Sequence, residues 1–178
     1  VYEIPIKKGI LFAPHPAFAK NEKGEYVNHA LAPEVIDQLH NPMDLPQKGT
    51  RELTAEDFVY SIKRMANPRI IAPVYGTMVN YLPGLKDFAV QVRAEDKRLR
   101  ADLKPSDRDL PFLDLRKFEL KGVSAPDKHT LRLEVKGKYP QFPNWLAMTF
   151  FAPVPWEAEA FYAQKGMAKN NLSLNYWP

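Results

Sequence analysis

Cysteine is absent from the 178 residues, which excludes disulfide bonds, thiolate-bound metals and cysteine nucleophiles. The glycines never cluster, so the chain lacks a glycine-rich phosphate-binding loop. No apolar run reaches the roughly 18 residues of a membrane span, and residues 1–20 lack the charged and apolar regions of a signal peptide. We therefore expect no direct membrane insertion and no signal peptide within this chain.

Glycine is scarce beside proline, with eight glycines and seventeen prolines, and this ratio predicts many fixed turns and short elements. Hydrophobic residues make up 45% of the chain and aromatic residues 12%, which suffices for the core of one domain. The net charge of +4 is modest, and the densest basic stretch, Lys97, Arg98 and Arg100, lies among acidic residues. We interpret this stretch as a solvated helical face, so no nucleic-acid partner is expected.

Residues 54–66 give the strongest local signals for a helix. Thr54 precedes an apolar-periodic run, and Asp57 follows three residues later in the arrangement of a capping box. The apolar residues recur at helical spacing and predict one buried side, with polar residues on the flanks and in solvent. These apolar positions are Phe58, Ile62, Met65 and Ala66. Asn67 and Pro68 then end the helix, because the residue before a proline is disfavoured in the α region.

Alternation of apolar and polar residues predicts a small antiparallel sheet. One strand covers 2–6, and a hairpin covers 118–136, where Gly122 interrupts the alternation and suggests a β-bulge. Helical spacing predicts further helices at 85–103 and 155–165. We therefore predict an α+β fold in which these two helices and the capped one pack against a small antiparallel sheet.

Two shorter helices are predicted at proline-marked positions. Pro33 can occupy the first turn of a helix that runs through Leu39. Residues 143–148 can form another, with Trp145, Leu146 and Met148 buried.

Three segments carry longer motifs. The first is Leu53-Thr-Ala-Glu-Asp-Phe-Val-Tyr-Ser-Ile-Lys-Arg64, and the second is Val123-Ser-Ala-Pro-Asp-Lys-His-Thr-Leu-Arg-Leu-Glu-Val135. The third combines Tyr139-Pro-Gln-Phe-Pro143, Leu146-Ala147 and Pro153-Val-Pro-Trp-Glu157. In order and rough spacing they resemble the family 5 extracellular solute-binding proteins, the oligopeptide, dipeptide and nickel receptors of ABC importers. Lys8-Gly9-Ile10-Leu11-Phe12 is more weakly similar to a strand end of that family.

The resemblance implies lobe I of a two-lobed, type II periplasmic-binding-protein fold. Receptors of this family are several hundred residues long, so 1–178 is expected to be a single partial domain within that lobe. Residues 19–50 are expected to be a loop-rich insertion. The implied function is capture of a solute, with peptides favoured, between two lobes and delivery to an ABC permease in the membrane. The implied location is periplasmic or otherwise extracytoplasmic.

The polar residues give no catalytic or metal-binding arrangement. The four histidines lack metal-ligand spacing and are interpreted as ordinary surface residues; they are His15, His29, His40 and His129. Capping and helix-dipole roles explain Glu56 and Asp57, and Ser61 is interpreted as a helix-surface residue. We therefore predict no catalytic residue, no metal and no cofactor, and a protein that is not an enzyme.

The aromatic segment 74–81 holds the one candidate ligand-binding residue. Tyrosine offers a broad, rigid contact surface with a polar tip, which binding clefts use, although tyrosines also cover cores. Some oligopeptide receptors have a cleft-facing tyrosine shortly after the helix that resembles 54–66, and Tyr75 is the nearest match. The resemblance therefore implies that Tyr75 contacts the ligand.

The alternative function is a stand-alone interaction module that presents 19–50 to a protein partner, and a metal-dependent enzyme ranks third.

Overall fold

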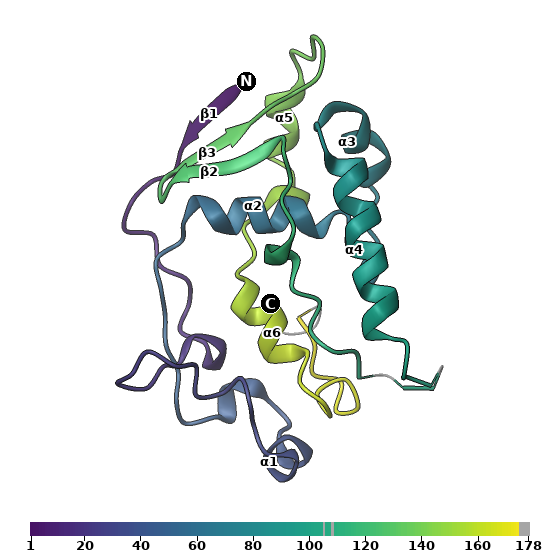
Figure 1. Cartoon of the computed structure of the whole chain (residues 1–178). Coiled ribbons are helices and arrows are strands. Elements are labelled where there is room, and N and C mark those ends of the chain that lie inside the picture. Colours follow the sequence, from purple (N-terminus) through teal and green to yellow (C-terminus); the bar gives the residue numbers. More distant parts are fainter. Residues whose placement is uncertain (105, 108, 175–178) are drawn as a thin grey trace. The chain divides into compact units, whose positions relative to one another are not determined.

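The structure is a computed structural model that describes residues 1–104, 106–107 and 109–174 (Figure 1). These residues form two compact units. Unit 1 consists of Val1–Ile10, Leu53–Arg98 and Leu115–Pro155. Unit 2 consists of the described residues of Leu11–Glu52, Leu99–Asp114 and Trp156–Pro178.

Unit 1 is built on a three-stranded antiparallel sheet in the order β1-β3-β2, visible in Figure 1. The strands are β1, Tyr2–Pro5; β2, Val123–Asp127; and β3, Thr130–Leu133. Tyr2 pairs with Leu133 and Pro5 pairs with Thr130, so the proline lies on an edge strand, where its missing N–H is tolerated. The predicted sheet of an N-terminal strand and a hairpin is confirmed.

Gly122 marks a close backbone approach and not the predicted bulge. Its N–H donates to the Pro83 carbonyl at 3.1 Å, and a Cβ on this residue would lie 2.7 Å from the Pro83 oxygen. The irregularity in the register of β2 and β3 lies further on, between Ser124 and Asp127. The prediction of a bulge at Gly122 is therefore wrong. The backbone N–H of Gly122 pairs with Pro83, which lies 39 residues earlier in the chain, and not with the neighbouring strand.

Helix α2, Ala55–Arg64, lies below the strands in Figure 1 and packs against β2 and β3. It also contacts two 3-10 turns, η3 at Leu115–Lys117 and η4 at Thr149–Phe151. The capping box is confirmed, because the Thr54 N–H donates to the carboxylate of Asp57 at 2.8 Å. Because other segments cover this helix on more than one side, Ser61 is only 4% exposed. Its prediction as a surface residue is wrong.

Three further helices complete unit 1: α3 at Tyr75–Tyr81, α4 at Leu85–Leu99 and α5 at Phe142–Leu146. The predicted helix at 85–103 is confirmed as α4, which ends four residues earlier than predicted, and Phe88 and Val92 are fully buried. Helix α5 buries Phe142 and leaves Met148 47% exposed. The predicted burial of Met148 is wrong, because the helix ends at Leu146 and the chain turns away into η4. Trp145 and Leu146, which are also predicted to be buried, are only half-buried.

Unit 2 holds helices α1, Pro33–Gln38, and α6, Trp156–Tyr162, with 3-10 turns η1, Pro16–Phe18, and η2, Pro42–Asp44. Both helices confirm predicted ones, and α6 packs against η1. The core of this unit draws on segments far apart in the sequence: Ala17, Ile36, Leu39, Leu45, Phe161, Tyr162, Met167 and Leu172. Across the described part of the chain, no helix combines the length and the apolar character needed to cross a bilayer.

Candidate functional site: a pocket beside helix α2

A pocket of about 220 Å³ opens in unit 1 beside the C-terminal half of α2. Its walls come from this helix, from the connection 70–74 and from 149–154. Three lining residues are polar: Ser61, Arg64 and Thr149. The other eight are apolar: Met65, Ile70, Ile71, Ala72, Val74, Phe150, Ala152 and Val154. The pocket is therefore mainly apolar with one positive charge among its lining residues.

Two of these walls are fastened to each other by hydrogen bonds. The Ser61 hydroxyl donates to the Ala152 carbonyl at 2.6 Å, and the Val154 N–H donates to the Asp57 carbonyl at 3.4 Å. Both bonds join α2 to 149–154, so one side of the pocket is held at a fixed width. The Ser61 bond joins residues 91 positions apart, and no pattern in the sequence pairs them.

Large apolar side chains at the pocket are left in solvent. Ile71 is 93% exposed and Phe150 is 40% exposed, and both belong to the pocket lining. Single exposed hydrophobic residues are ordinary, but these two share one apolar pocket, which makes the pocket the candidate binding surface of unit 1. Sequence reasoning missed both residues, because neither lies in a periodic run.

Tyr75 lies at the edge of this site. It is the first residue of α3 and directly follows Val74, whose buried side chain lines the pocket. The Tyr75 ring is half-buried and is not part of the lining. Among the residues that the structure describes, none makes a hydrogen bond with its hydroxyl. A ligand contact by Tyr75 stays a prediction.

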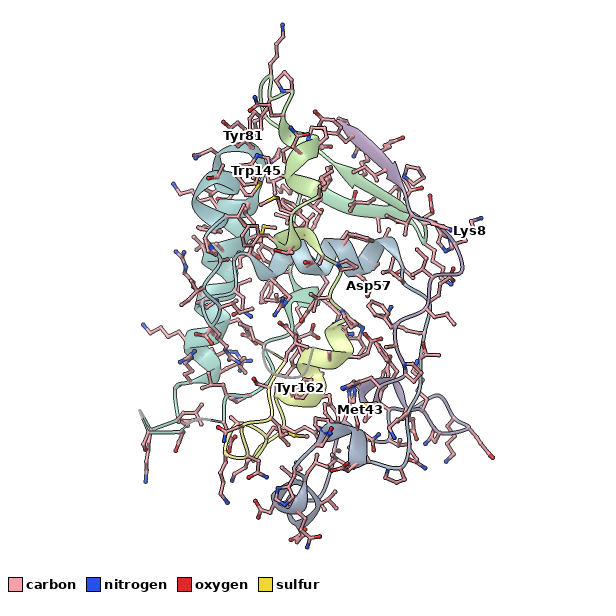
Figure 2. The ribbon with its side chains drawn as sticks, turned by 180° about the vertical axis from the view of Figure 1, so that it is seen from behind. Lys8, Met43, Asp57, Tyr81, Trp145 and Tyr162 are labelled. Carbon is pink, nitrogen blue, oxygen red and sulfur yellow. The ribbon has the colours of Figure 1, made fainter. Side chains whose placement is uncertain are left out.

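An aromatic stack holds α3 against the segment that contains α5. The rings of Tyr81 and Tyr139 stack at 4.2 Å between centroids with an interplanar angle of 12°. The Trp145 indole N–H donates to the Tyr139 hydroxyl at 2.7 Å, and Figure 2 labels Tyr81 and Trp145 on the two helices. The helix that begins with Tyr75 is therefore anchored at its other end.

The third motif supplies an ion pair within unit 2. Glu157 is buried, and its two oxygens accept from Nε and Nη2 of Arg51, each at 2.7 Å. The Tyr26 hydroxyl donates to the same carboxylate at 2.9 Å. Burial raises the pKa of Glu157, but hydrogen bonds and charge from Arg51 outweigh it, so the pKa lies below its usual value. A carboxylate held this way has a structural role.

Two of the four histidines are structural, so their prediction as ordinary surface residues is wrong. His15 Nδ1 accepts from the Ala17 N–H at 3.1 Å, so its proton sits on Nε2, which lies 3.1 Å from the Tyr162 hydroxyl. Burial lowers the pKa of His15 and raises the pKa of Tyr162 to about 12. His29 lies 2.9 Å from the Ala17 carbonyl and stacks on Tyr26.

Metal coordination finds no support in the side chains that the structure describes. They contain no group of three or more His, Asp or Glu residues placed to hold a metal ion. Grouped imidazoles and carboxylates are the usual ligands for zinc or nickel in a chain without cysteine.

Comparison with known proteins agrees with the three motifs. A model of the family described as "Bacterial extracellular solute-binding proteins, family 5 Middle" matches residues 48–173. No curated protein and no solved structure matches the chain. Members of the family are extracytoplasmic in general. The weaker similarity at 8–12 lies outside the matched residues and stays a prediction. The chain belongs to family 5 of the bacterial extracellular solute-binding proteins, and this membership supports a solute-binding role in ABC import.

Proposed function

We propose that this chain is part of the substrate-binding component of an ABC importer for peptides and contributes to its first lobe. The observation that carries the proposal is the apolar pocket of about 220 Å³ beside α2. Whole small-molecule sites measure about 300–1,000 Å³, so this pocket is suited to one side chain of a larger ligand. Peptides present such side chains one at a time along an extended backbone.

The proposed mechanism is capture without chemistry. A peptide binds between two lobes, the lobes close about a hinge, and the closed receptor delivers its cargo to a membrane permease. No bond is made or broken. The test at this level is genomic: the encoding reading frame should continue into a second lobe and lie beside permease genes. A frame with neither feature would favour a stand-alone module.

We further propose that 19–50 is an insertion in this lobe. The family match begins at residue 48, so nearly all of this segment lies outside it. The segment nevertheless contributes Ile36, Leu39 and Leu45 to the core that also holds Phe161. These three side chains are therefore used within unit 2, although Val35 and Met43 of the same segment are exposed, and their burial disfavours a loop displayed as a whole for a separate partner.

Tyr75 is the proposed ligand contact. No described residue makes a hydrogen bond with its hydroxyl, and its ring is half-buried. Both features suit contact with a peptide that passes the start of α3. In the intact receptor, Tyr75→Ala should weaken peptide binding at least fivefold, which is about 1 kcal/mol, whereas Tyr75→Phe should retain the ring's share. Calorimetry measures both. An unchanged affinity for Tyr75→Ala would remove this residue from the site.

The 178 residues alone should not bind peptide tightly. Most ligand contacts in a two-lobed receptor come from both sides of its cleft, and a single wall leaves the peptide largely in water. Calorimetry with short peptides should therefore show no micromolar affinity. Micromolar binding by this chain would contradict capture between lobes.

A further inference from the structure

We infer that the pocket beside α2 binds the apolar C-terminal residue of a peptide, with the side chain in the pocket and the terminal carboxylate at Arg64. The inference rests on the proposed function in taking the ligand to be a peptide. It goes beyond that proposal by naming which end of the peptide binds and which side chains are accepted.

Pocket size selects one side chain. An engineered apolar cavity of about 150 Å³ holds a benzene molecule. The volume of about 220 Å³ here therefore accepts a leucine, isoleucine or phenylalanine side chain and leaves little room for a second. A glycine or alanine side chain would leave the pocket unfilled.

The lining selects an apolar group. Ser61 already donates its hydroxyl proton to Ala152, so an apolar occupant leaves that donor satisfied. Ile71 and Phe150 are exposed large apolar side chains of the lining, and an occupant would remove part of their surface from water. Such burial is favourable in proportion to its area. Asp, Glu and Asn side chains gain nothing comparable there.

The positive charge in the pocket lining selects the C-terminal end of a peptide ligand. Arg64 is the one charged residue among the lining residues, all of which the structure describes, and it lies in the last turn of α2. A guanidinium carries five N–H donors, so it can bind a carboxylate alongside other partners. A lysine or arginine side chain of the ligand would be repelled. An apolar C-terminal residue of a peptide carries its side chain and the terminal carboxylate on the same Cα, so the two groups can reach the pocket and Arg64 together.

Small single-residue probes test the pocket on the 178-residue chain itself. N-acetyl-L-leucine, N-acetyl-L-leucinamide and N-acetylglycine are titrated while amide shifts are followed by NMR. N-acetyl-L-leucine should bind saturably in the millimolar range, with shifts at Ala72 and Val154. The neutral leucinamide should bind at least about threefold more weakly, because it lacks the carboxylate. N-acetylglycine should not saturate.

Three variants assign these shifts to the pocket. Ala152→Leu fills it, keeps the carbonyl that Ser61 uses, and should abolish N-acetyl-L-leucine binding. Ile71→Ser changes a 93% exposed side chain, so folding should be unaffected, and should weaken binding about fivefold. Val90→Ser, on the 58% exposed Val90 of α4, is the matched control and should change nothing. Arg64→Gln should make N-acetyl-L-leucine and its amide bind equally.

The inference is overturned if N-acetylglycine binds as well as N-acetyl-L-leucine. It is also overturned if Ile71→Ser and Val90→Ser behave alike, or if Arg64→Gln keeps the preference for the carboxylate. The probes are not peptides, so their result is separate from the proposed function. Loss of peptide binding in Tyr75→Ala with unchanged probe binding would support the pocket assignment. An intact receptor that ignores peptides but shows the probe pattern would overturn the proposed function and the peptide as ligand, and would leave the preference of the pocket for an apolar side chain beside a carboxylate.

Discussion

Arg51 and Glu157 face each other in a two-point ion pair, with Nε to Oε1 and Nη2 to Oε2 both 2.7 Å. The Glu157 side chain is 2% exposed and that of Arg51 is 25% exposed, so the pair is largely withdrawn from water. Glu157 is the second residue of α6, and Arg51 is the last residue but one of the segment Leu11–Glu52, which precedes helix α2 in the sequence. The pair therefore fastens that segment to the family motif within unit 2.

Arg51→Met should cost about 3 kcal/mol of the free energy of unfolding, because it leaves a buried carboxylate without its cation. The pH dependence should also change. In the native protein the pKa of Glu157 is lowered, so its stabilising contribution is present above about 4.5 and is lost as the pH falls through the lowered pKa. Without Arg51, burial raises this pKa above its unfolded value, so the folded state holds an extra proton and the variant should lose stability as the pH rises above about 4.5. Urea unfolding between pH 4 and 7 measures both effects.

The control is Arg98→Met. Arg98 also binds a carboxylate at 2.7 Å, that of Glu95, but its side chain is 68% exposed. Solvent screens such a pair, so no measurable change is expected. Equal losses for the two variants would show that burial does not set the strength of the Arg51 pair.

Local sequence signals predict most of the helices and strands correctly. The features that were predicted wrongly depend on contacts between residues far apart in the sequence. The Thr54 cap and the Pro33 helix start depend on neighbours within three residues, and both predictions are confirmed. Ser61 and Gly122 depend on Ala152 and Pro83, which no spacing rule pairs with them. The pocket has the same origin, because three separate segments line it. Tyr75 could be proposed as a ligand contact from its position after the family's helix motif. The pocket beside it could not be predicted from the sequence.

His15 should make stability fall on mild acidification. Its pKa is 6.5 in the unfolded chain, and burial lowers it in the folded state. Between the lowered value and about 6.5 the unfolded state holds more protons, so the free energy of unfolding decreases as the pH drops below about 6.5. The groups that face it, Tyr162 and the Phe161 ring, carry no charge that would compensate.

His15→Asn keeps a side-chain oxygen that can accept from the Ala17 N–H and removes the titration. Its unfolding free energy should change less between pH 7.5 and 5.5 than that of the native protein. His40→Gln, at an exposed position, should leave the native pH dependence intact. If the His40 variant flattens the profile instead, the assignment to His15 is wrong.

Asp57→Ala should remove about 1–2 kcal/mol by taking away the acceptor for the Thr54 N–H at the start of α2. Figure 2 labels Asp57 on this helix, and the side chain is 2% exposed. Glu56→Ala is the matched control, because Glu56 is an exposed acid in the same turn that takes no part in the box. Urea unfolding should show a much smaller loss for Glu56→Ala, and similar losses would indicate that charge, not capping, matters here.

Gly122→Ala should lower stability by about 2 kcal/mol, because an added Cβ would lie 2.7 Å from the carbonyl oxygen and Cδ of Pro83. Neither atom is the end of a flexible side chain, so the backbone must shift, and the 3.1 Å hydrogen bond from Gly122 to Pro83 weakens with it. Gly76→Ala offers the opposite case in the same unit. Gly76 lies inside α3 with nothing within 4 Å of an added Cβ, so alanine should stabilise the protein by about 0.5–1 kcal/mol. Thermal and urea unfolding of the two variants should therefore shift in opposite directions, and a shift of the same sign would contradict the packing of Gly122 against Pro83.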